Sequence, residues 1–170
     1  LPLMIQACDG LGAAHKEGVL HRDIKPGNLF VLDEGRTLKV MDFGIAKAQR
    51  VEGSLTATGT LVGSPAYIAP ERLRGDGGDG VAADLYALGV VMYQLVTGVL
   101  PFQAREMPAL FMQHISEAPT PPSRRNPLVP AAVETIVLTL LSKDPADRYA
   151  SCRALRKAVE AAWGETLRVG

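Results

Sequence analysis

The chain has 170 residues, of which 47% are hydrophobic and 21% charged, with 18 basic side chains against 18 acidic ones. This length and composition indicate one soluble globular domain that buries about 70% of the surface exposed by its unfolded chain. The balanced, dispersed charge argues against a nucleic-acid partner. Cys8 and Cys152 are too few for a disulfide framework or a zinc site, so we expect two small buried thiols in a cytoplasmic protein.

The first part of the chain predicts a helix followed by a β-hairpin. Apolar residues recur at helical spacing over residues 3–17, and Gly18 is a suitable end for that helix. Two short apolar segments, residues 29–32 and 38–41, are separated by a polar turn and predict antiparallel strands. Residues 48–70 follow as a polar segment that is too long for a simple connection, so we expect it to be functional.

The rest of the chain predicts helices. Residues 82–97, ended by Gly98, are apolar on nearly every side, which indicates a helix that is buried all round. Three further helices are expected over residues 106–117, 131–143 and 151–163. Gly164 is expected to close the last of them, and the proline-rich residues 119–130 to form an extended connector. The predicted fold class is therefore mainly α with one small β-hairpin.

Oxygen-bearing side chains gather at one end of the predicted hairpin. Asn28 lies just before its first strand and Asp42 just after its second, so antiparallel pairing brings both to the same end. Asp23 lies in the loop that enters this end. Hard oxygen ligands without a histidine or thiolate cluster suit Mg²⁺, and Lys25 adds the positive charge that a transferred phosphoryl group needs. These residues predict a nucleotide-dependent phosphotransfer site.

Three short motifs resemble those of protein kinases. The sequence His-Arg-Asp-Ile-Lys-Pro-Gly-Asn at residues 21–28 resembles the catalytic loop, and Asp-Phe-Gly at 42–44 resembles the metal-binding motif. Ala-Pro-Glu at 69–71 resembles the end of the activation segment. A single tripeptide such as Asp-Phe-Gly is weak evidence for the family. Three motifs in the family's order and spacing are strong evidence for it. Further matches to the family are Asp84, residues 100–102 and residues 144–148.

The resemblance covers essentially the whole chain and implies a protein-kinase-like fold restricted to the carboxy-terminal lobe. It makes residues 1–170 one domain. Its parts would be the catalytic loop at 21–28, the metal motif at 42–44, the activation segment at 42–71 and the helical subdomain at 81–164.

The resemblance also implies a role for each residue of the site. Asp23 matches the catalytic aspartate, which orients the substrate hydroxyl and accepts its proton, and Lys25 matches the lysine that touches the transferred phosphate. Asn28 and Asp42 match the Mg²⁺ ligands, and together with Lys25 and Phe30 they are the expected ATP-binding residues. A lysine at position 25 is the pattern of serine/threonine kinases. The implied reaction moves the γ-phosphate of ATP, with Mg²⁺ or a substituting Mn²⁺, to serine or threonine hydroxyls of protein substrates.

Other matched residues are implied to support the site. His21 and Phe43 match the lower half of an apolar stack that links the two lobes of active kinases. Asp84 matches the aspartate that anchors the catalytic-loop backbone. Glu71 and Arg148 match a buried ion pair that fastens the activation segment, where the loss of one partner would strand the other charge.

The activation segment carries the regulatory expectations. Arg22 beside the catalytic aspartate marks kinases that are switched by phosphorylation of this segment, by a partner kinase or by the protein itself. The candidate acceptors are Thr56, Thr58 and Thr60. The alternative is that these threonines are only solvated loop residues. Ser64 replaces a usual threonine and keeps its hydroxyl, and Gly44 completes the metal motif.

Four residues that resemble ligand or binding features have simpler structural explanations. His15 and His114 are expected to be helix-surface or partly buried histidines without a function. Met92 and Met112 lie on apolar helix faces and are expected to pack in the core.

The elements that cover ATP in the family do not occur upstream of the catalytic loop in this sequence. Residues 1–20 read as one helix and contain no Gly-x-Gly-x-x-Gly, so this chain by itself is expected to bind ATP poorly. One hypothesis is an active kinase whose amino-terminal lobe belongs to a longer protein, which could also carry a membrane anchor. The other is a catalytically silent half-kinase that binds proteins. The complete set of catalytic residues favours the first hypothesis.

Overall fold

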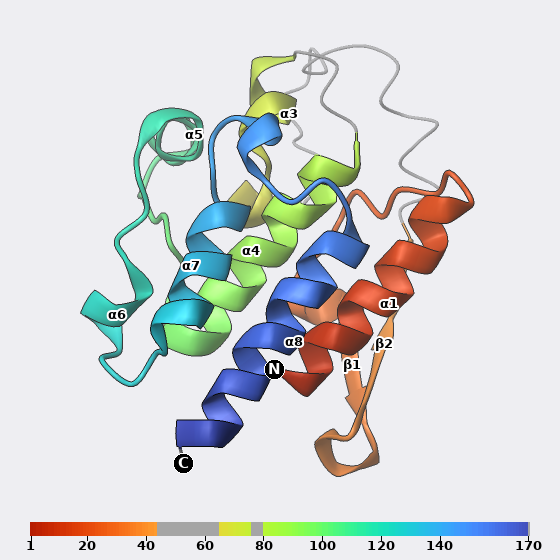
Figure 1. The fold of residues 1–170 in the computed structure, drawn as a ribbon. Helices are drawn as coiled ribbons and strands as arrows, with labels where there is room; N and C mark the ends of the chain where they lie inside the picture. Colours follow the sequence, from red (N-terminus) through yellow and green to blue (C-terminus); the bar gives the residue numbers. More distant parts are fainter. Residues whose placement is uncertain (44–64, 76–79, 170) are drawn as a thin grey trace.

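The computed structural model describes residues 1–43, 65–75 and 80–169 (Figure 1). These residues form a mainly helical unit with a two-stranded antiparallel sheet, which confirms the predicted fold class. The helices are α1 (Pro2–Lys16), α3 (Pro70–Arg74), α4 (Val81–Thr97), α5 (Met107–Ser116), α6 (Pro122–Arg125), α7 (Ala131–Leu140) and α8 (Cys152–Val169). The strands are β1 (Leu29–Leu32) and β2 (Thr37–Val40). No helix in the described ranges has both the length and the hydropathy to cross a bilayer.

Helix α4 is the centre of the helical part. Every residue from 83 to 93 is buried, as the all-round apolar pattern predicts. Helix α7 packs beside it, and α8 and α1 lie side by side next to this pair (Figure 1). Gly98 ends α4 in a left-handed conformation with φ of 78°, and its N–H donates to the carbonyl of Gln94 at 2.8 Å.

The hairpin packs against α1 and ends at the predicted site. Leu29 pairs with Val40 and Leu32 with Thr37, so β2 begins one residue earlier than predicted. The side-chain amide of Gln6 in α1 donates to the carbonyl of Arg36 at 2.8 Å and accepts from the N–H of Leu38 at 2.9 Å. One amide side chain thus satisfies backbone groups along the outer edge of β2 and fixes the hairpin to α1.

Two predicted boundaries in the carboxy-terminal half are wrong. Helix α8 continues through Gly164 to Val169, since an interior glycine costs a helix only about 1 kcal/mol and helix formers follow it. Helix α7 ends at Leu140 rather than at residue 143. There the chain turns so that the carbonyls of Ser142 and Lys143 point to the guanidinium of Arg148, at 2.8 and 3.4 Å.

The proline-rich connector also differs from the prediction. Residues 119–130 contain the short helix α6, because a proline at the first helical position is preorganised for a helix. The carboxylate of Glu134 in α7 accepts the N–H of Ser123 at 2.6 Å, which satisfies one of the amides at the start of α6.

Burial of the sulfur-containing residues follows the predictions with one exception. Cys8 and Cys152 are buried free thiols, and Met92 is 2% exposed. Met112 is instead 57% exposed. Helix α5 buries Leu110 and its i+4 neighbour at position 114, and a residue halfway between them points away from the core.

A close approach between α4 and α7 gives the first prediction. A Cβ atom on Gly89 would lie 2.6 Å from the Cβ of Leu140 and 3.3 Å from its carbonyl carbon. We expect Gly89→Ala to lower the free energy of unfolding by about 1–3 kcal/mol, because the two helices must move apart. Urea unfolding followed by circular dichroism measures this change.

Gly164→Ala is the matched control, because a Cβ on Gly164 meets no atom within 4 Å. The same exchange of residues should there raise the free energy of unfolding by up to about 1 kcal/mol through helix propensity. Changes of the same sign in the two variants would contradict the close packing at Gly89.

Candidate active site

The loop between α1 and β1 is fixed by a buried carboxylate from the central helix. Asp84 in the first turn of α4 is 3% exposed. Its Oδ2 accepts the backbone N–H of His21 and its Oδ1 accepts that of Arg22, both at 2.8 Å. These charge-assisted bonds compensate the buried charge and set the position of residues 21–28 relative to the core.

Arg22 has a backbone conformation that needs such support. Its φ of 65° lies in the left-handed region, which costs a residue with a side chain roughly 1–3 kcal/mol. The bond from its N–H to Asp84 holds one side of this residue. Its carbonyl accepts Nη1 of Arg72 in α3 at 3.0 Å, which holds the other side. The strained residue immediately precedes Asp23.

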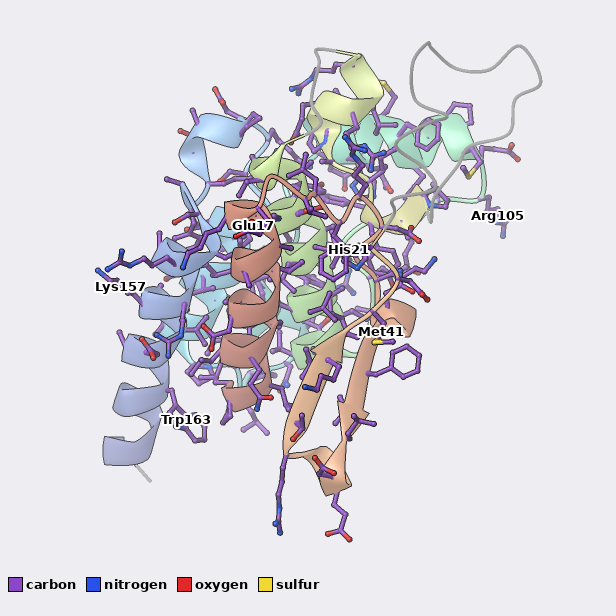
Figure 2. All side chains as sticks on the ribbon, turned by 90° about the vertical axis from the view of Figure 1, so that its right-hand side faces the viewer. Glu17, His21, Met41, Arg105, Lys157 and Trp163 are labelled. Atoms are coloured by element: carbon purple, nitrogen blue, oxygen red, sulfur yellow. The ribbon has the colours of Figure 1, made fainter. Side chains whose placement is uncertain are left out.

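His21 connects the same loop to the end of the hairpin. It is fully buried, and its Nε2 donates to the carbonyl of Met41 at 2.9 Å. Its Nδ1 accepts the N–H of Asp23 at 3.3 Å, which fixes a neutral tautomer with the proton on Nε2. The rings of His21 and Phe43 lie 4.8 Å apart. Figure 2 shows His21 beside Met41, between α1 and the end of the hairpin.

Asp23, Lys25 and Asn28 form one hydrogen-bonded group. The Nζ of Lys25 donates to Oδ2 of Asp23 at 2.8 Å. The Nδ2 of Asn28 donates to the carbonyl of Asp23 at 2.8 Å and to its Oδ2 at 3.3 Å. The Asp23 side chain is 10% exposed and that of Lys25 is 29% exposed, so the group faces solvent from a partly buried position.

Asp42 lies next to this group across the hairpin. The N–H of Met41 donates to the carbonyl of Asn28 at 2.9 Å, which extends the strand pairing by one residue and puts Asp42 just beyond it. Asp42 is exposed, with φ of 56°, and its carboxylate has no hydrogen bond to any residue in the described ranges. The structure thus brings Asp23, Asn28 and Asp42 to one end of the hairpin.

The fit of a metal ion here depends on two side chains. No group of three histidine, cysteine, aspartate or glutamate residues suited to a metal occurs in the described part of the chain. The Oδ1 of Asn28 accepts no hydrogen bond from the described residues, and the Asp42 carboxylate is likewise available. A pair of oxygen ligands suits Mg²⁺, which takes one or two side chains and completes its shell with water and substrate phosphates.

A second buried ionic anchor holds helix α3. Arg148 forms a bidentate pair with Glu71 of α3, with Nη1–Oε1 at 2.7 Å and Nη2–Oε2 at 2.8 Å. The side chains of Arg148 and Glu71 are 0% and 7% exposed. Arg148 also donates to the carbonyls of Ser142 and Ala82 and lies 4.8 Å from the ring centroid of Tyr86. These contacts join α3 to α4 and to the turn after α7.

Several predicted site residues lie apart from this cluster or cannot be placed. Phe30 is half exposed on β1, opposite Lys39. Five predicted residues of the metal motif and activation segment lie outside the described residues: Gly44, Thr56, Thr58, Thr60 and Ser64. The described part of the chain resumes at Pro65.

Two histidines that were given no function make specific buried contacts. His15 in α1 donates from Nε2 to Oδ2 of Asp84 at 2.9 Å. His114 in α5 is fully buried, with its Nδ1 2.9 Å from the hydroxyl of Tyr86. Burial, and then the charge of Lys143, lowers the pKa of His114 to about 4, so its ring is neutral at physiological pH. A sequence pattern does not show such contacts, because they depend on how distant helices pack.

Comparison with known proteins agrees with this geometry. The sequence matches the family described as Protein kinase domain over residues 2–163, which is most of the chain. The chain therefore belongs to the protein kinase family.

Relatives that the chain resembles over most of its length are bacterial serine/threonine kinases. The chain is 46% identical to serine/threonine-protein kinase Pkn1 of Myxococcus xanthus, over 98% of this chain and 24% of the relative. It is 43% identical to the probable serine/threonine-protein kinase PknB of Corynebacterium glutamicum, over 86% of this chain and 23% of the relative. The serine/threonine-protein kinase PknB of Mycobacterium tuberculosis is 38% identical over 92% of this chain and 25% of its own length. The chain spans about a quarter of these relatives.

The Glu71–Arg148 pair gives the second prediction. Glu71→Ala leaves the Arg148 guanidinium buried without its carboxylate, so we expect the free energy of unfolding to fall by about 3–5 kcal/mol. Glu160→Ala is the control, because Glu160 pairs with Arg156 at 3.0 Å where both side chains are 40% or more exposed. That change should cost less than about 1 kcal/mol. Equal losses in urea unfolding would show that Arg148 does not depend on Glu71.

Proposed function

We propose that this chain is the carboxy-terminal lobe of a serine/threonine protein kinase catalytic domain. It would transfer the γ-phosphate of ATP to serine or threonine hydroxyls of protein substrates. The observation that carries this proposal is the group of Asp23, Lys25 and Asn28, held together at 2.8–3.3 Å on a loop that Asp84 anchors. The names of the relatives, which are serine/threonine kinases, support the same reaction.

In the proposed reaction Asp23 is the group that receives the proton. Its carboxylate would accept a hydrogen bond from the substrate hydroxyl, orient the oxygen towards the γ-phosphate and take up its proton as the new O–P bond forms. Lys25 holds Oδ2 of Asp23 at 2.8 Å and places its positive charge where negative charge develops on the transferred group. Positioning and charge, rather than covalent chemistry, would then account for catalysis.

Asn28 and Asp42 would hold Mg²⁺, which neutralises phosphate charge when ATP is bound. Asn28 is suited to this because its Nδ2 donates to Asp23, while its Oδ1 accepts no hydrogen bond from any residue that the structure describes. Phe30, half exposed on β1, would offer an apolar surface to the nucleotide. The proposed divisions are the catalytic loop at 21–28, the metal motif at 42–44, the activation segment at 42–71 and the helical subdomain at 81–164.

Regulation by the activation segment is part of the proposal. The Nη1 of Arg72 donates to the carbonyl of Arg22 at 3.0 Å, so the Arg72 guanidinium lies beside the loop that carries Arg22. A phosphate on Thr56, Thr58 or Thr60, added by a partner kinase or by the protein itself, would find cations there. Use of ATP and two unpaired buried thiols favour a cytoplasmic location for this domain.

Asp23→Asn tests the proposed acid–base role. In the protein produced from the native gene, we expect phosphate transfer from radiolabelled ATP to a protein substrate to fall by roughly 100-fold or more, because the amide cannot accept the proton. Asp33→Asn, at the exposed hairpin turn, should leave the rate unchanged. A rate for Asp23→Asn within a few-fold of wild type would overturn the assigned role.

Asp42→Asn tests the proposed metal ligand. Asparagine tolerates the positive φ at this position but lacks the charge of the carboxylate. We expect the Mg²⁺ concentration needed for half-maximal ATP binding to rise about tenfold or more, since ligand charge sets divalent-cation affinity. Titration of nucleotide binding against Mg²⁺ measures this shift, with Glu160→Ala as the control. An unchanged midpoint would exclude Asp42 as a ligand.

A further inference from the structure

Close packing of α1 on α8 brings two unassigned side chains together behind the catalytic loop. A Cβ atom on Gly12 in α1 would lie 3.3 Å from the Cβ of Cys152, the first residue of α8. His15 follows Gly12 by three residues and lies on the same face of α1. Cys152 is 2% exposed and the His15 side chain is 8% exposed, so both are shielded from solvent.

A continuous set of hydrogen bonds runs from this contact to the catalytic loop. The Sγ of Cys152 lies 3.4 Å from Nδ1 of His15. The Nε2 of His15 lies 2.9 Å from Oδ2 of Asp84, which also accepts the N–H of His21 at 2.8 Å. His21 in turn accepts the N–H of Asp23 on its Nδ1 at 3.3 Å. These hydrogen bonds connect α8, α1, α4 and the loop of residues 21–28.

We propose that Cys152 and His15 form a buried relay that orients Asp84 and, through it, the catalytic loop. His15 is then a positioning residue, and Cys152 is the residue that sets the orientation and tautomer of its ring. The proposal deepens the proposed function, on which its effect on phosphate transfer depends. The effect of the relay on the orientation of the loop does not depend on that function.

The direction of the hydrogen bonds follows from the thiol. Burial, and then the charge of Asp84, raises the pKa of Cys152 to about 12, so the sulfur keeps its proton. The S–H therefore donates to Nδ1 of His15, and Nε2 carries the proton that is donated to Asp84. Without the Cys152 thiol, the His15 ring would lose the hydrogen bond that fixes its orientation. Without the His15 ring, the buried Asp84 carboxylate would lose one of its three N–H donors.

Cys8 provides a matched control for this role. It is also a free thiol, 2% exposed, and burial together with the nearby Cys152 raises its pKa to about 12. No hydrogen bond joins Cys8 to His15 in the described residues. Cys8→Ala and Cys152→Ala thus remove the same buried atom, but only the second breaks the relay.

The first experiment measures hydrogen exchange in the protein produced from its native gene. Mass spectrometry follows peptides that contain the amides of His21 and Arg22, which donate to Asp84. We expect these amides to exchange about five-fold faster in Cys152→Ala than in Cys8→Ala, in line with one weakened buried hydrogen bond. Cys152→Ser keeps a donor and should exchange like wild type. Equal exchange in Cys152→Ala and Cys8→Ala would overturn the relay.

Substitution of His15 separates hydrogen bonding from packing. His15→Gln places an amide nitrogen close to the position of Nε2, whereas His15→Phe fills a similar volume without a donor. We expect His15→Phe to lower kcat for phosphate transfer about five-fold or more with an unchanged KM for ATP, and His15→Gln to restore most of it. Equal kcat values in both variants would reduce His15 to a packing residue and overturn the proposal.

The hydrogen-exchange and kinetic measurements test the relay and the proposed function independently. Exchange at His21 and Arg22 requires no catalysis, so an inactive wild-type protein would contradict the proposed function and leave the exchange comparison decisive for the relay. If His15→Phe does not fold, the cysteine variants, which change one atom, still decide it.

Discussion

The Asp84 carboxylate is the constraint on which the proposed active site depends. It lies in the first turn of the central helix, where the helix dipole favours a negative charge, and it accepts three N–H donors. A buried charge without such partners would be strongly unfavourable. With them, it holds Arg22 in a left-handed conformation directly before Asp23. The buried core thereby determines where the loop between α1 and β1 places the Asp23 carboxylate.

The Glu71–Arg148 pair fixes the other side of the site in a related way. Asp84 binds the backbone amides of His21 and Arg22, whereas Arg148 binds a side chain of α3 and several carbonyls. Both anchors contact the amino-terminal half of α4, because Arg148 also donates to the carbonyl of Ala82. Helix α3 and the loop of residues 21–28 are therefore both positioned relative to α4, and their relative position follows from the burial of that helix.

The sequence predicted the elements whose cause is local and missed those whose cause is tertiary. Helical periodicity and the strand–turn–strand pattern predicted α1, α4 and the hairpin. Antiparallel pairing predicted that Asn28 and Asp42 lie at the same end of the hairpin, where the structure has them, whereas the roles of these residues stay predictions. The short helix α6 was missed because prolines also suit extended segments. The exposure of Met112 and the contacts of His15 depend on which helix faces meet. Local periodicity does not determine which helix faces meet, because that depends on tertiary packing.

The hairpin leaves apolar side chains of β1 exposed and one edge of that strand without a paired strand among the described residues. Phe30, Val31 and Leu32 are about half exposed on β1, at 50%, 50% and 47%. Gln6 occupies the outer edge of β2, but no strand in the described residues pairs with the other edge of β1. An apolar, uncovered edge strand is a template for pairing between chains. Self-association of the separate chain at high concentration would therefore begin at β1.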